Sequence, residues 1–172
     1  MRQKISLARE IIKPSVPESK MLVAERLNAP YFDPTYHSHP EYQLFLVTRG
    51  EGTRFIGESI SPFKEGDMVL TGPNLPHVWR NETSYFDRAS QKVTGGIVIY
   101  FHDHFLRKDF QEKEELENIH FLLQKSMRGL EITGKTNAEV STLMEKVVAS
   151  SGSRGFIKLL EILDILAQSK EC

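Results

Sequence analysis

The chain has 172 residues, which is enough for one well-buried domain or for a domain with an appendage. Its 22 basic and 23 acidic residues nearly cancel, so charge gives no indication of a surface for nucleic acid or for an anionic membrane. Cys172 is the single cysteine, which excludes an internal disulfide framework and fits a reducing, cytoplasmic compartment. No apolar run approaches the ~20 residues that a membrane helix needs, so no membrane partner is expected.

The first hundred residues predict a series of short strands. Residues 1–18 contain Pro14 and Pro17 and are expected to form an irregular N-terminal arm. A first strand is expected over residues 20–28. Further short apolar runs, separated by Gly and Pro turns, predict strands at 44–48, 53–56, 59–63, 68–71, 77–80 and 96–101. Many short strands between such turns are typical of a sandwich or barrel.

After His102 the spacing of the apolar residues changes to that of a helix. A helix is expected around residues 116–123, with His120 as a core histidine, and His102 and His104 are interpreted as surface histidines. Residues 130–133 are expected to return to the barrel as a short strand. Residues 136–139 match a capping box, which predicts that the next helix starts there.

The last predicted helix, over residues 154–168, is more apolar than a helix with one buried face needs to be. An apolar stripe of ~100° is sufficient for a helix that packs on its own domain. We therefore expect a homodimer, with the alternative that the helix is buried between two elements of its own domain. The expected dimer interface consists of Phe156, Leu159, Leu160, Leu163 and Leu166.

The chain is organised around the stretch from Tyr36 to Asn81, which has His37 and His39 near its start and His77 near its end. Because every second side chain of a strand shares a face, one strand is expected to present His37, His39, Gln43 and Arg49 together. His77 and Trp79 share a face of a later strand by the same rule. These residue types predict a polar cavity inside a small β-structure.

The same residues resemble the motifs of a known family. His37-x-His39 with Gln43 and Gly50 resembles the first cupin motif, and the run GDMVLTGPNLPHVW, residues 66–79, resembles the second cupin motif as it stands in the N-terminal sensor domain of AraC-type transcriptional regulators. The two C-terminal helices resemble the dimerisation helices of that family. The resemblance implies a mainly β fold with C-terminal helices, in which residues 19–101 form a cupin-like double-stranded β-helix (a jelly-roll barrel) and residues 102–172 form a helical dimerisation segment.

The resemblance also implies a function. The chain is expected to be the effector-binding and dimerisation part of such a regulator and not an enzyme. The DNA would be read by a helix-turn-helix domain outside this chain, and the effector would be a small polar molecule such as a sugar. The residues expected to bind it are His37, His39, Gln43, His77, Trp79 and Arg49. Two of these have alternatives, since Trp79 also suits core packing and Arg49 also suits an exposed turn.

A metal site is the alternative to a metal-free cavity. In metal-dependent cupins the positions that match His37, His39, Gln43 and His77 hold a divalent ion. Gln43 stands where that motif has a glutamate, and a neutral amide is a poorer ligand for such an ion. We therefore expect no cofactor, with a divalent metal as the alternative. The corresponding alternative function is a metal-dependent dioxygenase or isomerase.

Overall fold

The computed structural model describes residues 16–103 and 113–172, and its strands form two antiparallel sheets. The larger sheet has the order β1-β7-β2-β5-β8 and the smaller sheet has the order β4-β3-β6. The strands are β1 (Leu22–Ala29), β2 (Tyr42–Arg49), β3 (Gly52–Ile56), β4 (Ser59–Phe63), β5 (Met68–Thr71), β6 (His77–Asn81), β7 (Thr94–Phe101) and β8 (Leu130–Glu131). The predicted strands are all present, including the short strand that returns to the larger sheet after residue 102.

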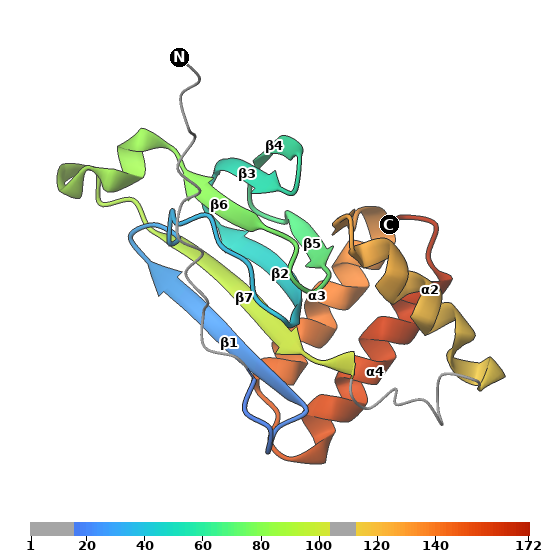
Figure 1. Ribbon diagram of the computed structural model, residues 1–172. Helices are drawn as coiled ribbons and strands as arrows, with labels where there is room; N and C mark the ends of the chain where they lie inside the picture. The colour runs from blue at the N-terminus through green and yellow to red at the C-terminus, as the bar shows by residue number, and fades with distance from the viewer. Residues whose placement is uncertain (1–15, 104–112) are drawn as a thin grey trace.

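In residues 113–172 the α-helices are α2 (Glu117–Ser126), α3 (Gly134–Val148) and α4 (Ser153–Gln168), and β8 lies between α2 and α3 in the chain. Short 3-10 helices lie at η1 (Thr83–Phe86), η2 (Arg88–Ser90) and η4 (Glu114–Leu116). Figure 1 shows the α-helices gathered on one side of the strands, away from β3 and β4. Within the described ranges, none of the helices has the length and apolar character that a membrane crossing needs. The prediction of a mainly β fold with C-terminal helices is confirmed.

Strand β2 divides the molecule into two apolar cores because its alternate side chains point to opposite faces. Leu44 and Leu46 belong to the core that the larger sheet shares with the helices. Phe45 and Val47 belong to the core between the two sheets, together with Trp79 of β6. The central strand is therefore buried on both faces, and its odd-numbered residues face the interior of the barrel.

Helix α4 corrects the predicted dimer interface. Leu159, Leu163 and Leu166 are only 0%, 1% and 1% exposed and lie in the core that the helices share with the larger sheet. Helices α2 and α3 both pack against α4, so two neighbours and the sheet cover its wide apolar stripe. Of the predicted interface, Phe156 and Leu160 are half-buried. The alternative, burial within its own domain, accounts for the three leucines.

The predicted capping box is wrong, because α3 begins at Gly134, before Thr136. The carboxylate that serves its first turn comes from Glu171, beyond the end of α4. The Thr136 amide donates to Oε2 of Glu171 at 2.8 Å, and this bond is the main reason why the pKa of Glu171 is lowered. The Thr133 amide donates to the Glu171 carbonyl at 3.0 Å, so the C-terminal residues fold back onto the start of α3.

Candidate functional site

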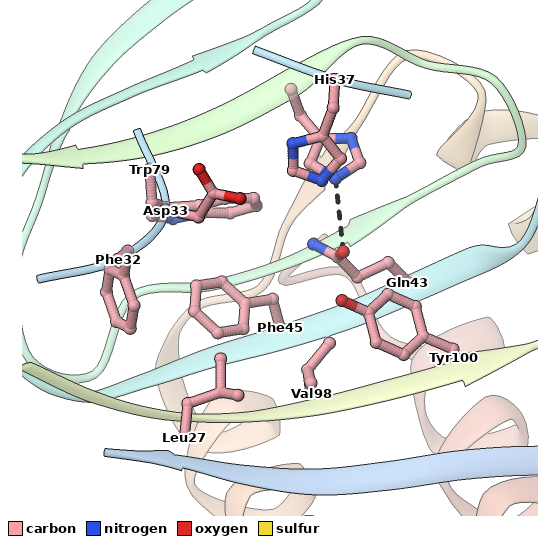
Figure 2. A pocket seen from close by; sticks show the side chains of 10 residues that line it. Leu27, Phe32, Asp33, His37, Gln43, Phe45, Trp79, Val98 and Tyr100 are labelled. Atoms are coloured by element: carbon pink, nitrogen blue, oxygen red, sulfur yellow. Dashed lines mark hydrogen bonds between the residues drawn. The ribbon is translucent and has the colours of Figure 1, made fainter. Parts of the chain in front are cut away.

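A cavity of about 60 Å³ lies between the two sheets, inside the barrel. Figure 2 shows that its wall has two unlike parts, a polar end at His37 and Gln43 and an apolar end at Phe32, Phe45 and Leu27. The cavity is lined by Leu27, Phe32, Asp33, His37, Gln43, Phe45, His77, Trp79, Val98 and Tyr100.

His77 lies at the start of β6, a later strand as predicted, whereas His37 and His39 do not belong to the strand of Gln43 that was predicted to carry them. Strand β2 begins only at Tyr42, so His37 and His39 precede it. Backbone hydrogen bonds join His37 to His77 at the start of β6, with His37 N to His77 O at 3.2 Å and His77 N to His37 O at 2.8 Å. This isolated bridge brings the first motif against the second.

The rings of His37 and His77 are each oriented by a hydrogen-bond acceptor behind them. Nδ1 of His37 lies 2.8 Å from the Thr35 carbonyl, and Nδ1 of His77 lies 2.7 Å from the Leu75 carbonyl. A carbonyl oxygen only accepts, so both Nδ1 atoms are donors and both Nε2 atoms carry the lone pair in the neutral ring. Nδ1 of His39 faces Oε2 of Glu41 at 3.3 Å.

The far side of the rings converges on Gln43. Its Oε1 lies 3.2 Å from Nε2 of His39 and 3.3 Å from Nε2 of His77. One ring nitrogen from each of His37, His39 and His77 lies within 4.8 Å of the others. Three of the four residues of the predicted metal set are thus grouped closely, and the fourth faces two of them.

This donor set fits a divalent metal ion. Imidazole rings that donate from Nδ1 to a carbonyl or carboxylate present Nε2 to a metal, which is the usual outer-shell arrangement of metal-binding histidines. The side chain of Gln43 lies on the same side of the His39 and His77 rings as their Nε2 atoms, where an ion would be held. His37, His39 and His77 would hold the ion, which would polarise a bound oxygen ligand.

Trp79 lines the cavity and is tied to the helical segment through charged groups. Its Nε1 donates to Oδ2 of Asp67 at 3.1 Å, and Oδ1 of Asp67 lies 3.4 Å from Nε of Arg54. Arg54 in turn donates to Oε2 of Glu131 on β8 at 2.7 Å. Burial raises the pKa of Asp67, and Arg54 and the Trp79 hydrogen bond oppose that rise. Gly66 supplies the turn before Asp67 with a φ of 89°, which a residue with a side chain rarely adopts.

Glu41 lies behind His39 and does not line the cavity. It is 1% exposed, and its Oε1 accepts the Val16 amide at 3.0 Å and lies 3.6 Å from Nε2 of His102. His102 thus faces the buried Glu41 and is itself partly exposed, with 22% of its side-chain surface accessible, while His104 lies outside the described residues. These contacts join His39 to the residues before β1 and after β7.

Arg49 does not contribute to the cavity. It is exposed, because an irregularity in the β2–β7 pairing between Val47 and Arg49 interrupts the alternation of the strand. Strand parity had placed Phe45 on the face of Gln43, although Phe45 was not among the expected ligand-binding residues. Tyr100, which pairs with Gln43 in register, was missed. Asp33 belongs to the segment before the histidines and had no comparable signal.

The cupin domain family model matches residues 29–85. Together with the two antiparallel sheets, this match shows that the chain contains a cupin-fold domain followed by helices, which confirms the predicted fold class. No curated protein matches the chain.

Three solved structures illustrate what the chain is similar to. ToxT from Vibrio cholerae O395, bound to (E)-4-(8-methylnaphthalen-1-yl)but-3-enoic acid, has a TM-score of 0.51 and 13% identity, over 83% of this chain and 54% of that chain. The AraC-like transcriptional activator CuxR has a TM-score of 0.47 and 12% identity, over 77% and 46%. A cupin 2 conserved barrel domain protein from Rhodopseudomonas palustris has a TM-score of 0.39 and 18% identity, over 50% and 55%. The chain spans about half the length of each, and the likeness to ToxT extends to the fold alone.

Proposed function

We propose that the chain is the effector-binding part of an AraC-type transcriptional regulator and that it does not turn its ligand over. The observation that carries the proposal is the cavity, in which convergent polar groups lie inside a barrel whose larger sheet shares one core with the C-terminal helices. The motif at residues 66–79 and the likeness of fold to ToxT, whose structure contains a bound carboxylic acid, support the same assignment.

A ligand in the cavity would act on the helices through differences in contact between two arrangements of the chain. Trp79 touches the cavity and bonds to Asp67, which is paired with Arg54 and through it with Glu131. The neighbouring turn is fastened to α3, since Nδ2 of Asn137 donates to the Gly66 carbonyl at 2.9 Å. A displacement of Trp79 would therefore reach the start of α3.

The effector is a small polar molecule. The cavity of about 60 Å³ is small, which favours a polar molecule smaller than a sugar ring. Trp79 and Phe45 supply aromatic walls, and the histidines with Gln43 supply the polar contacts.

The regulator would act as a homodimer in the cytoplasm and bind DNA through a domain outside the 172 residues. With Leu159, Leu163 and Leu166 buried in the core, the surface for a second copy is the outward face of α4. Ile157 is 59% exposed there, next to the half-buried Phe156 and one turn before Leu160. Dimers that dissociate on Ile157→Asp would support this surface.

A metal-dependent enzyme is the second candidate, and the cluster of His37, His39 and His77 is the observation that favours it. The two candidates differ in one outcome: an enzyme converts the molecule that it binds, and a sensor returns it unchanged. Recovery of the ligand after incubation with the metal-loaded chain therefore separates them.

Trp79 makes the test direct, because it is the single tryptophan of the chain and it lines the cavity. Small polar molecules would be titrated while the tryptophan emission is recorded. An effector should change the emission of the unchanged chain and of His120→Ala, whose site is on α2, and should leave that of His77→Ala unaltered. Conversion of the ligand to a product would refute the sensor.

The regulatory half of the proposal needs a second experiment. In a longer chain that includes the DNA-binding part, the same effector should change DNA affinity about fivefold or more. A coding sequence that has no helix-turn-helix within ~100 residues after Cys172 would refute the assignment to this class of regulator.

A further inference from the structure

A second pocket lies outside the barrel, between α2 and the residues where β2 begins and β7 ends. Its volume is about 450 Å³, which is several times that of the cavity between the sheets and lies within the range of small-molecule sites, ~300–1,000 Å³. We call it the outer pocket, and it is lined by Tyr42, Asp103, Glu117, His120, Phe121, Leu123, Gln124 and Met127. None of these residues lines the barrel cavity, so the two sites are separate.

The walls of the outer pocket include large apolar side chains that the fold leaves accessible. Phe121 and Met127 are 54% and 47% exposed, whereas Tyr42 and Leu123 belong to the core that the helices share with the larger sheet. The face of a phenyl ring attracts a cation, and the flexible thioether of methionine adapts to the shape of an apolar ligand. These walls suit a ligand that has an apolar body.

The charged groups of the outer pocket favour a positive ligand. Among the described residues that line it, Asp103 and Glu117 are carboxylates and none is a lysine or an arginine. Tyr42 donates a hydrogen bond to Asp103, and burial, followed by the charge of Asp103, raises the pKa of Tyr42 to about 12. The phenol therefore keeps its proton at neutral pH. Because a carboxylate has several acceptor positions, Asp103 can accept a further hydrogen bond from a ligand.

His120 adds an acceptor that the fold does not use. Its Nε2 is buried and has no hydrogen-bond partner within the described part of the chain, although buried side-chain nitrogens are normally bonded. With the ring proton on Nδ1, Nε2 of a neutral imidazole accepts a hydrogen bond. A ligand that donates to Nε2 would relieve the cost of leaving it unpaired. His120, expected to be a core histidine, is thus partly buried and lines the outer pocket.

We propose that the outer pocket binds a small organic ammonium ion, with its positive group among Asp103, Glu117 and His120 and its apolar body against Phe121 and Met127. An ammonium group has only donors, which matches two carboxylates and an unpaired ring nitrogen. Asp103, Glu117 and His120 do not form one of the close ligand groups found in the described residues, which favours an organic cation over a metal ion. The inference goes beyond the proposed function, because it concerns a second site and does not depend on what the barrel binds.

Phenethylammonium and 2-phenylethanol are a matched pair of probes, since they share the phenylethyl body and differ in the charged group. In calorimetric titrations the unchanged chain should bind the cation about tenfold more tightly than the alcohol. In an isotope-labelled chain, the backbone amides that shift when the cation is added should lie on α2 around His120 and Phe121. Equal affinity for the two probes, no binding of the cation, or shifts confined to the barrel strands would each overturn the inference.

Two variants test the polar groups of the outer pocket. Asp103→Asn and His120→Ala should each weaken binding of phenethylammonium about fivefold or more. Asp164→Asn, which makes the same change at an exposed position on α4, is the matched control and should bind as the unchanged chain does. Undiminished binding by both folded pocket variants would overturn the inference. The comparison of the two probes needs no variant, so it decides the question even if a variant does not fold, and a barrel that responds to no effector would leave this site standing.

Discussion

Replacing Leu159 by alanine separates the two roles that α4 can have. If Leu159 lay at a dimer interface, as the sequence suggested, its truncation would weaken association and leave the protomer folded. In the structure it is fully buried in the core between the helices and the larger sheet. Its truncation should therefore destabilise the protomer itself. Ile157, two residues earlier and 59% exposed, is the matched control on the same helix.

The expected loss follows from the burial of the side chain. Leu→Ala removes the equivalent of about three methylene groups, worth about 2.4 kcal/mol at ~0.8 kcal/mol each. The cavity left in a close-packed core adds to this, so we expect a loss of about 3 kcal/mol, within the usual range for buried leucines. For a chain of this length that lowers Tm by roughly 6–12 °C. Ile157→Ala should change stability by at most ~0.5 kcal/mol.

Urea and thermal unfolding measure the stability, and sedimentation at several concentrations measures the oligomeric state. Leu159→Ala should unfold earlier at every concentration, while its oligomeric state follows that of the unchanged chain until it unfolds. A variant that keeps the original Tm as a monomer, or a loss below ~1 kcal/mol, would refute the assignment of Leu159 to the core.

Three further predictions concern charged groups. Burial raises the pKa of Asp67 above its ordinary 3.8, so the stability that Asp67 contributes is complete below pH 3.8 and is lost as the pH rises through the raised pKa. In urea titrations Asp67→Asn should therefore become more stable relative to the unchanged chain as the pH rises through this range. A relative loss of stability would contradict this. The pKa of Glu171 is lowered from 4.5, mainly by the hydrogen bond from the Thr136 amide, so the stability that Glu171 contributes is present above pH 4.5 and is lost as the pH falls through the lowered pKa. Glu171→Ala should therefore speed hydrogen exchange of the Thr136 amide at neutral pH, and this effect should disappear in acid. Glu41→Gln should weaken Co²⁺ binding about 10–100-fold in a competition titration, because it removes the carboxylate behind His39, and unchanged affinity would count against that role.

The strands could be predicted because β2 and its neighbours are short apolar runs between turns, and side chains alternate between the two faces of a strand. The same alternation places Gln43 and Phe45 in the cavity. It could not place His37 and His39, because they precede β2 and are positioned by the bridge between His37 and His77, a pairing that is distant in sequence. Loop pairings of this kind leave no periodic pattern.

Apolar periodicity also could not distinguish a helix covered by a second copy from one covered by its own chain. The wide stripe of α4 is covered by two other helices and a sheet, which the composition of α4 alone does not reveal. The capping of α3 was missed for a related reason. The carboxylate that accepts a hydrogen bond from the Thr136 amide belongs to Glu171, which is 35 residues later in the chain.

Two charge networks lead from the cavity to its surroundings. Glu41 joins His39 to Val16 and His102, and Asp67 joins Trp79 to Arg54 and Glu131. The inner pairs, His39 with Glu41 and Arg54 with Asp67, are buried, and the attraction between buried charges changes steeply with distance because the surroundings have a low dielectric constant. A ligand that moves His39 or Trp79 therefore alters contacts with segments outside the barrel. A catalytic centre gains little from such connections, whereas a sensor depends on them.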